Sequence, residues 1–436
     1  MNQTPARFIF RVFPLAFHCR DWTRIGGLCV LLAVCSFELD AQEAPQFQPA
    51  MFLRANDSFA LDLLKKTHDD TPERNIVVAP RPVSLIFAAL WDGTRDVESA
   101  KEFRAAFHWD KDFATPMGGK MLLTRFARPK PYPKSHRPRP KDSTLLRYMQ
   151  SGTPEELWLS AAFLYRGAGS LSQDFIDRVT YDFGLSFRAV GEHTPQSEIL
   201  AKNWDTLLPM PKVTGPNDFW ITSFTHLRTS WAGNTFLGGK REKRDFHLRS
   251  GDIVQADFLK SEFENYPYVR TEEFEAIVLT CWQATILLVL PSADSTIEQL
   301  EASYAKNPNL IEPLLARREG DVRLPPFHFS FEVNLRNSLE KMGVHRIFDD
   351  QHTLLPMAPQ MSGGILRGVA QKTEITLDEN GIRADAGTIF HGVYGGVLGV
   401  QSPFHMTLDR PFLFIVRDNV TRALLFAGVV MNPTLQ

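Results

Sequence analysis

Apolar residues at helical spacing mark the first elements of the folded region. Four of them recur every three or four positions and predict a helix over 52–65. A short apolar run at 75–80 predicts a strand. The segment 83–91 is apolar on all sides, so we expect a helix buried in the centre of the fold, with Pro82 tolerated in its first turn.

Further along the chain, the pattern changes from helical to strand periodicity. A buried stripe predicts a helix over 172–183, and Gly184 follows it at the usual stop position. The predicted strands are 185–190, 276–280, 285–290, 411–416 and 423–430. The last two strands are apolar on both faces, which indicates that they lie between layers. Because helices fill the first half and strands the second, we expect one large α+β domain.

Composition places the chain among ordinary globular proteins. It has 436 residues, 48 Lys and Arg against 50 Asp and Glu, and a formal net charge of −2. With 44% hydrophobic residues it can bury a substantial core, and it shows no internal repeat. This near-neutral charge gives no reason to expect a nucleic-acid partner.

Residues 1–44 are interpreted as an export segment with a short tail. Arginines precede an uncharged apolar run at 25–37, whose 13 residues suit a signal peptide and are too few to span a ~30 Å hydrocarbon core. The alternative is a lipid anchor at Cys35. After removal of the segment only Cys281 remains, so we expect a secreted, extracellular protein without disulfides, with a periplasmic or anchored location as the alternative.

The stretch 125–147 is basic and rich in proline. It holds eight basic residues, one acidic residue and five prolines, for a local charge of +7. Proline at this density excludes a regular helix and favours extended backbone. We interpret the stretch as a solvated surface loop, and the alternative is a contact with a polyanion or an anionic membrane.

The chain contains none of the usual signatures of an active site. G-x-S-x-G, H-E-x-x-H, the phosphate-binding G-x-x-x-x-G-K-[ST] and paired C-x-x-C are all absent. The histidines are scattered, and the adjacent pair Asp349 and Asp350 is weak support for a cation site. We therefore expect no enzyme activity, no cofactor and no metal.

Several motifs in order resemble the serpins, a family of serine-protease inhibitors that trap proteases by a conformational change. The matching segments are NIVVAP at 75–80, LSQDFIDRVTYDFGLSF at 171–187, VRLPPFHFSFEVNLRNSLEKMGVHRIFDD at 322–350, LDENGIRADAGT at 377–388 and DRPFLFIVRDNVTRALLFAGVVMNP at 409–433. The resemblance implies a serpin domain at 45–436, with three β-sheets, eight or nine helices and an exposed hinge and reactive loop at 379–403.

By this resemblance, the hinge of the reactive loop contains Glu379, Gly381, Ile382, Ala384, Ala386, Gly387 and Thr388. In an inhibitory serpin this segment enters the central sheet as a new strand after cleavage. Strand alternation then turns Ile382 and the even-numbered residues after it inward, and Arg383 and Asp385 outward. We expect the loop to be exposed to solvent before cleavage. Ile382 departs from the family's Thr or Ser and indicates slower insertion.

The resemblance also assigns three positions in the central sheet. Ser223 and Gln371 match residues that hold the shutter, where the strands part, and Trp231 matches the tryptophan at the upper end of the sheet, the breach. Hydroxyls that the family carries near the shutter are missing at Ala79 and Pro82. These losses put the efficiency of insertion in question.

We therefore expect a monomeric inhibitor of serine proteases, or of cysteine proteases, and the alternative is a non-inhibitory serpin that acts as a binding or carrier module. Counting from the hinge by the family's spacing places the scissile bond at Gly395-Gly396, and counting back from Pro411 places it nearer Val400. Between these positions Leu398-Gly399 offers a side chain that a protease pocket could bind, and Tyr394-Gly395 offers another. No Lys or Arg occurs between Arg383 and Arg410. The loop therefore predicts a target protease with an apolar specificity pocket.

Overall fold

The computed structural model describes residues 49–94, 96–109, 156–165, 171–183, 186–189, 218–232, 235–236, 239–350, 352–359, 364–384 and 402–435. The export segment, the basic stretch 125–147 and residues 385–401 of the predicted reactive loop lie outside these ranges. No helix in the described part is long and apolar enough to cross a membrane.

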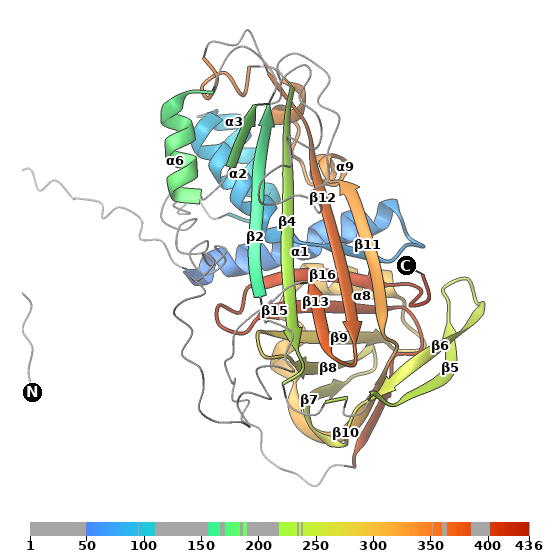
Figure 1. Cartoon of the computed structure of the whole chain (residues 1–436). Coiled ribbons are helices and arrows are strands. Elements are labelled where there is room, and N and C mark those ends of the chain that lie inside the picture. The colour runs from blue at the N-terminus through green and yellow to red at the C-terminus, as the bar shows by residue number, and fades with distance from the viewer. Residues whose placement is uncertain are drawn as a thin grey trace, which may run out of the picture. The chain divides into compact units, whose positions relative to one another are not determined.

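One sheet consists of six strands that run along the molecule (Figure 1). In spatial order they are β11 (Phe327–Asn334), β12 (Ile365–Asp378), β13 (Gly381–Ala384), β4 (Asp218–Ser230), β2 (Glu156–Tyr165) and β3 (Ser186–Ala189). β4 pairs with β2 along its length in antiparallel register and with part of β12 in parallel register.

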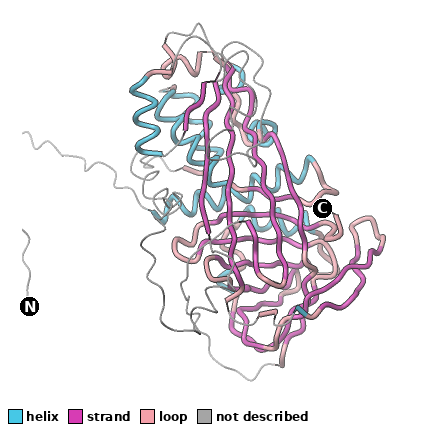
Figure 2. Tube along the Cα trace, viewed as in Figure 1, coloured by secondary structure: helices cyan, strands magenta, loops and turns pink. Residues whose placement is uncertain are grey.

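The second sheet has ten strands, which cross the direction of the first set (Figure 2). In order they are β1 (Ile76–Val78), β16 (Leu424–Val430), β15 (Phe412–Asp418), β9 (Ala284–Pro291), β8 (Phe274–Thr280), β7 (Glu264–Arg270), β10 (Ala316–Leu324), β6 (Ile253–Lys260) and β5 (Arg241–His247), with β14 (Phe404–Thr407) paired to β10. Three separate sheets were expected. The described strands form two, because β10 pairs with β7 near its start and with β6 at its end.

The described residues contain seven α-helices and one 3₁₀ helix. They are α1 (Pro49–Asp70), α2 (Pro80–Thr94), α3 (Val97–Ala106), α6 (Gln173–Phe183), α8 (Ile297–Lys306), α9 (Arg336–Lys341), α10 (Arg346–Asp349) and the 3₁₀ helix η3 (Glu312–Leu314). The predicted α+β class is confirmed, and each helix and strand predicted from periodicity corresponds to an element of the structure.

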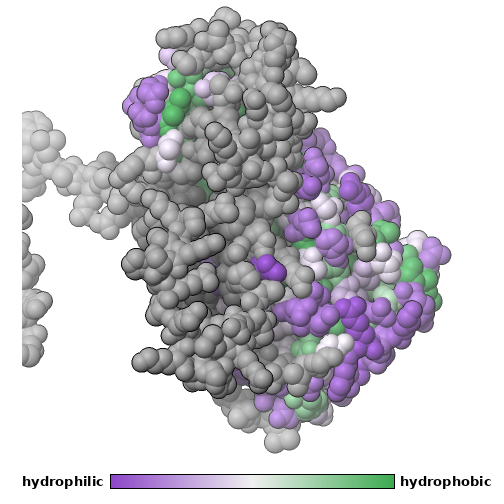
Figure 3. Space-filling model, viewed as in Figure 1, coloured by the Kyte–Doolittle hydropathy of each residue, from purple (hydrophilic) through white to green (hydrophobic). Residues whose placement is uncertain are grey.

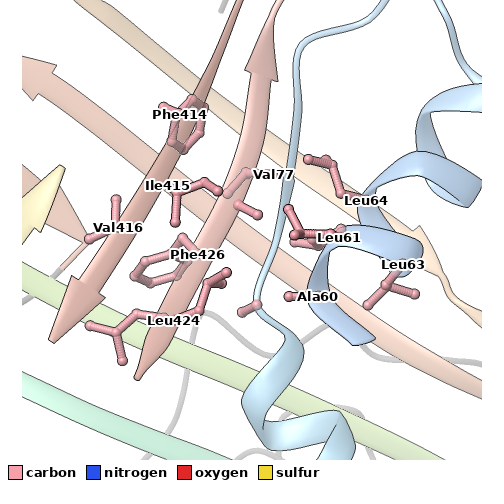
Figure 4. Packing of buried hydrophobic residues seen from close by; sticks show 14 of the residues in the cluster. Ala60, Leu61, Leu63, Leu64, Val77, Phe414, Ile415, Val416, Leu424 and Phe426 are labelled. Atoms are coloured by element: carbon pink, nitrogen blue, oxygen red, sulfur yellow. The ribbon is translucent and has the colours of Figure 1, made fainter. Parts of the chain in front are cut away.

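The core lies where α2 passes between the two sheets. α2 contacts β2 and β4 on one side and β16 on the other, and its residues from Pro80 to Leu90 are all buried. Every residue of β15 and β16 is buried as well, and β16 packs against α1 (Figure 4). The structure thus confirms that a segment apolar on all sides forms a central helix.

A buried pair of a histidine and a glutamate joins α1 to α8, and burial also raises the pKa of the Glu301 carboxyl. His68 and Glu301 have side chains only 1% and 2% exposed, and His68 Nδ1 lies 2.7 Å from a Glu301 carboxylate oxygen. The other ring nitrogen lies 3.2 Å from the Pro72 carbonyl, so a doubly protonated ring donates to both acceptors. Burial opposes the charged ring, but the hydrogen bond and charge of Glu301 outweigh burial and raise the pKa of His68.

This pair predicts a stability that depends on pH. Because the folded-state pKa of His68 is raised, its contribution is fully present below the unfolded value of about 6.5 and is lost as pH rises through the folded value. His68→Gln should therefore lower the thermal midpoint more at pH 6 than at pH 9. The corresponding difference in the free energy of unfolding is about 1.4 kcal/mol for each unit by which the pKa is raised. Melting curves across this range measure the difference.

The exposed His352 provides a control, because its side chain is 67% exposed beside Asp350. His352→Gln should leave the pH dependence of the thermal midpoint nearly unchanged. An equal effect of His68→Gln at pH 6 and pH 9 would contradict a charged, buried His68.

Candidate functional site

The predicted hinge already forms a strand in the six-stranded sheet. Residues 381–384 make up β13, which pairs in antiparallel register with both β12 and β4. A two-residue turn leads into it from Asp378, whose carboxylate accepts a hydrogen bond from the backbone N–H of Asn380 at 2.7 Å. The loop thus begins as a short strand between two neighbours and is covered on both edges.

Gly381 is required at the first position of this strand. Its φ of +139° is rarely adopted by other residues, and a Cβ there would lie 2.1 Å from the Thr229 carbonyl oxygen. A side chain at 381 would force β13 away from β4. The hinge glycine that the sequence pointed to is therefore also what allows the close approach to β4.

The expectation of an exposed hinge is wrong for its first residues. Ile382 is fully buried, opposite Thr229 on β4 and Leu377 on β12. Its side chain points inward, as strand alternation predicts. It is already buried in the intact chain, where only residues 381–384 of the loop pair with the sheet. The physical reason is that β12 turns directly into β13, which can then pair with both strands. A charged residue at 382 would therefore destabilise the intact protein as well as block insertion.

Trp231 and Arg241 fix the turn before β13. The indole N–H of Trp231 donates to the Asp378 carbonyl at 2.9 Å, and the side chain is nearly buried. The guanidinium of Arg241, at the start of β5, pairs with the hinge carboxylate of Glu379 at 2.5 Å. Trp231 was predicted from its motif. Arg241 was missed, because it lies 138 residues from Glu379 and carries no local signal.

Gln371 and Ser223 meet at the point where β12 and β4 begin to pair directly. The Gln371 amide donates to the Ser223 hydroxyl at 3.3 Å and to the Ala79 carbonyl at 2.7 Å. Its oxygen accepts from the Ala79 N–H at 2.8 Å. Both side chains are fully buried. The resemblance had assigned Gln371 and Ser223 to the same place, the shutter. The two shorter bonds, to the N–H and the carbonyl of Ala79, were not predicted. They involve backbone atoms, which leave no trace in the sequence.

Beyond the contact of Gln371 with Ser223, β12 and β4 pair directly with each other, and we call these direct pairs the seam. Six residue pairs join β12 to β4 directly, from Gln371 with Ser223 down to Ile365 with Asp218. A strand that continued β13 would have to separate these pairs. The seam is therefore the barrier that any insertion of the loop must overcome.

The remaining predicted positions divide between described and undescribed parts. Ala384 is placed by its backbone in β13. Ala386, Gly387, Thr388 and the bond candidates Gly395, Gly396, Leu398 and Gly399 lie outside the described residues.

No cluster of metal-ligating side chains occurs in the described ranges. The carboxylates of Asp349 and Asp350, considered above for a cation, form ion pairs with Arg336 and Arg346.

Comparison with known proteins identifies the fold. The family model "Serpin (serine protease inhibitor)" matches residues 54–433. A serine protease inhibitor of Rattus norvegicus is 23% identical over 90% of this chain and 92% of its own length. Serpin-Z2A of Triticum aestivum is 27% identical, and the match spans 52% of this chain and 59% of that protein.

Solved structures agree at the level of fold. The native stressed conformation of Arabidopsis AtSerpin1 superimposes with a TM-score of 0.70 at 15% identity, over 89% of this chain and all of that one. Human thyroxine-binding globulin complexed with thyroxine gives 0.67 at 19% identity, over 88% of this chain and 99% of that one. The family match covers most of the chain, including the hinge and both ends of the seam. The chain belongs to the serpin family.

Proposed function

We propose that this serpin is an exported inhibitor of serine proteases with apolar specificity, acting by cleavage of the reactive loop and its insertion into the six-stranded sheet. The observation that carries the proposal is β13, which pairs with β4 and β12 at the open end of a seam between the same two strands. A loop that already occupies the first positions of an added strand can extend it without changing register.

The register of β13 defines how far such a strand can run. Ala384 pairs with Leu227, and each further residue would move one position down β4, so Thr388 would reach Ser223 and Val393 would reach Asp218 at the end of the strand. Thr388 would also lie opposite Gln371, at the head of the seam. The candidate bonds Gly395-Gly396 and Leu398-Gly399 both follow this last position. Cleavage at either would release the whole inserting segment.

Alternation favours this insertion. The buried residues of β4 and β12 opposite Ile382 set the inward face, so Ala386, Thr388 and Phe390 would continue it. Small side chains at 384, 386 and 387 offer little steric resistance. The chemistry is supplied by the protease: its nucleophile attacks the loop carbonyl, the new amine leaves, and the acyl-enzyme is carried along with the inserting strand.

We also propose that the basic stretch 125–147 contacts a polyanion. Its local charge of +7 supports this, and a neighbour in fold, native protease nexin-1, was solved with heparin. Secretion remains part of the proposal and rests on the leader-like segment 1–44.

A protease panel tests the proposed inhibition. Chymotrypsin, elastase or subtilisin should form an SDS-resistant adduct, and the released C-terminal peptide should begin between residues 395 and 401. Trypsin should not, because the loop offers no cation to an acidic specificity pocket. The same proteases with a blocked active-site serine serve as controls. Cleavage without any adduct would favour the binding or carrier module. Stoichiometric trapping of trypsin by a cut inside 390–402 would refute the apolar specificity.

Substitution at the head of the seam tests how the sheet opens. Gln371→Leu removes both bonds to the Ala79 backbone and leaves the buried Ala79 N–H without its acceptor, at about 1–3 kcal/mol. It should lower the thermal midpoint and speed spontaneous loss of inhibitory activity. Ser223→Ala removes only the 3.3 Å contact and should cost less than about 1 kcal/mol. Equal effects of the two variants would show that the Ala79 contacts do not hold the seam.

A further inference from the structure

A short interval separates β13 from the seam. The last pair of β13 with β4 joins Ala384 to Leu227, whereas the seam begins at Ser223. Residues 224–226 of β4 therefore pair with neither β12 nor β13, and residues 372–375 lie opposite them on β12. We call this interval the junction. It lies next to the end of β13, the short strand between β12 and β4 in Figure 1.

Two threonines occupy the junction at the same level. The parallel register pairs Gln371 with Ser223, and Thr373 and Thr225 each lie two residues further along their strands. Because side chains two residues apart share a face of a sheet, both threonines lie on the buried face with Gln371 and Ser223. Thr225 is 2% exposed and Thr373 is 1% exposed. Two hydroxyls are thus placed in the core on opposite sides of the junction.

These hydroxyls are isolated polar groups. Neither has a hydrogen-bond partner within the described part of the chain, and the two do not bond to each other. The residue that pairs with Thr373 on β11 is Phe331, which is also buried. The described outer surface in Figure 3 is largely hydrophilic, whereas these hydroxyls lie beneath the sheet. Buried polar groups in native proteins are hydrogen-bonded to protein or to ordered water, so the junction indicates a small polar ligand.

The width of the junction suits a single water molecule. Strands that pair directly lie about 4.8 Å apart, and strands on either side of a third lie about twice as far apart. β4 and β12 change from the second spacing to the first across the junction. A water that bonds to two hydroxyls joins oxygen atoms up to about 5.6 Å apart, which is an intermediate distance. The neighbouring Ser223 hydroxyl accepts from Gln371 and keeps its own O–H for a third bond to this water.

We propose that Thr225 and Thr373 bind a buried water between β4 and β12 and that this water holds the two strands apart next to the seam. The seam then ends at a hydrated junction, so that its first pair, Gln371 with Ser223, is the one most easily separated. The assignment concerns the intact chain and holds whether or not the loop traps a protease. It adds to the proposed insertion a feature that favours opening of the sheet.

A high-resolution crystal structure of the intact protein tests the water directly. We expect one ordered water within hydrogen-bond distance of both threonine hydroxyls. The double variant Thr225→Val, Thr373→Val should lack this water. A residue of the chain bonded to either hydroxyl in its place, or a direct bond between the two threonines, would overturn the proposal.

A double-mutant cycle tests the water in solution. Thr225→Val and Thr373→Val each remove one partner of the water and leave the other hydroxyl poorly bonded, so each should lower the thermal midpoint by about 2 °C. The double variant removes both hydroxyls at nearly constant shape and should melt at or above the wild-type midpoint. Such coupling between two residues that do not touch indicates a bridging ligand. Independent, additive stabilisation by the two variants would mean that the hydroxyls are dry and would refute the bridge.

Thr229→Val is the matched control. Thr229 lies on the same face of β4 and is 2% exposed, but its hydroxyl accepts the Gln283 N–H at 3.0 Å. Its effect should add to that of Thr373→Val without coupling.

Hydrogen exchange of residues 218–223 and 365–371 reports on the seam itself. Exchange should be slower in the double valine variant than in wild type, because the strands can close across a dry junction. Equal rates would show that the water does not favour opening of the seam. Failure to trap an active protease would refute only the proposed inhibition.

Discussion

The direct pairing of β4 with β12 is the constraint on which the remaining arrangement depends. Six residue pairs close the lower part of the sheet, while β13 occupies the gap above them. When further loop residues insert, the direct hydrogen bonds between β4 and β12 are lost. The new strand then forms hydrogen bonds with β4 on one edge and with β12 on the other. The ordering entropy of the loop, about 1–2 kcal/mol per residue, opposes this gain. The intact chain thus holds a strand position that is only partly filled.

Contacts at the two ends of the gap determine how easily that position fills. At the head of the seam, Gln371 ties β12 to the backbone before α2 through two hydrogen bonds to Ala79. At the upper end, Arg241 and Trp231 hold the turn through Glu379 and the Asp378 carbonyl. The same fold therefore supports two outcomes, rapid insertion or a stable partly inserted loop. The non-inhibitory alternative corresponds to the second.

Sequence reasoning succeeded where a local pattern reports directly on burial. The all-apolar helix α2 and the fully buried strands β15 and β16 were each evident from a few neighbouring residues. It failed where the structure depends on residues far apart in the chain. Arg241 reaches Glu379, His68 reaches Glu301, and β10 joins two groups of strands that were expected to be separate. The exposed hinge was expected for a similar reason, since nothing in residues 381–384 alone reveals that two strands are free to pair with them.

The thermal midpoint before and after cleavage of the loop tests the central claim most directly. The loop is nicked between residues 394 and 400, the cut is verified by mass spectrometry, and both forms are melted under identical conditions. If residues 385–393 extend β13 between β4 and β12, the nicked form should melt more than about 10 °C above the intact form, because two complete strand edges replace one seam. An unchanged midpoint would mean that the loop does not insert, and would contradict the account of this serpin as a trapping inhibitor.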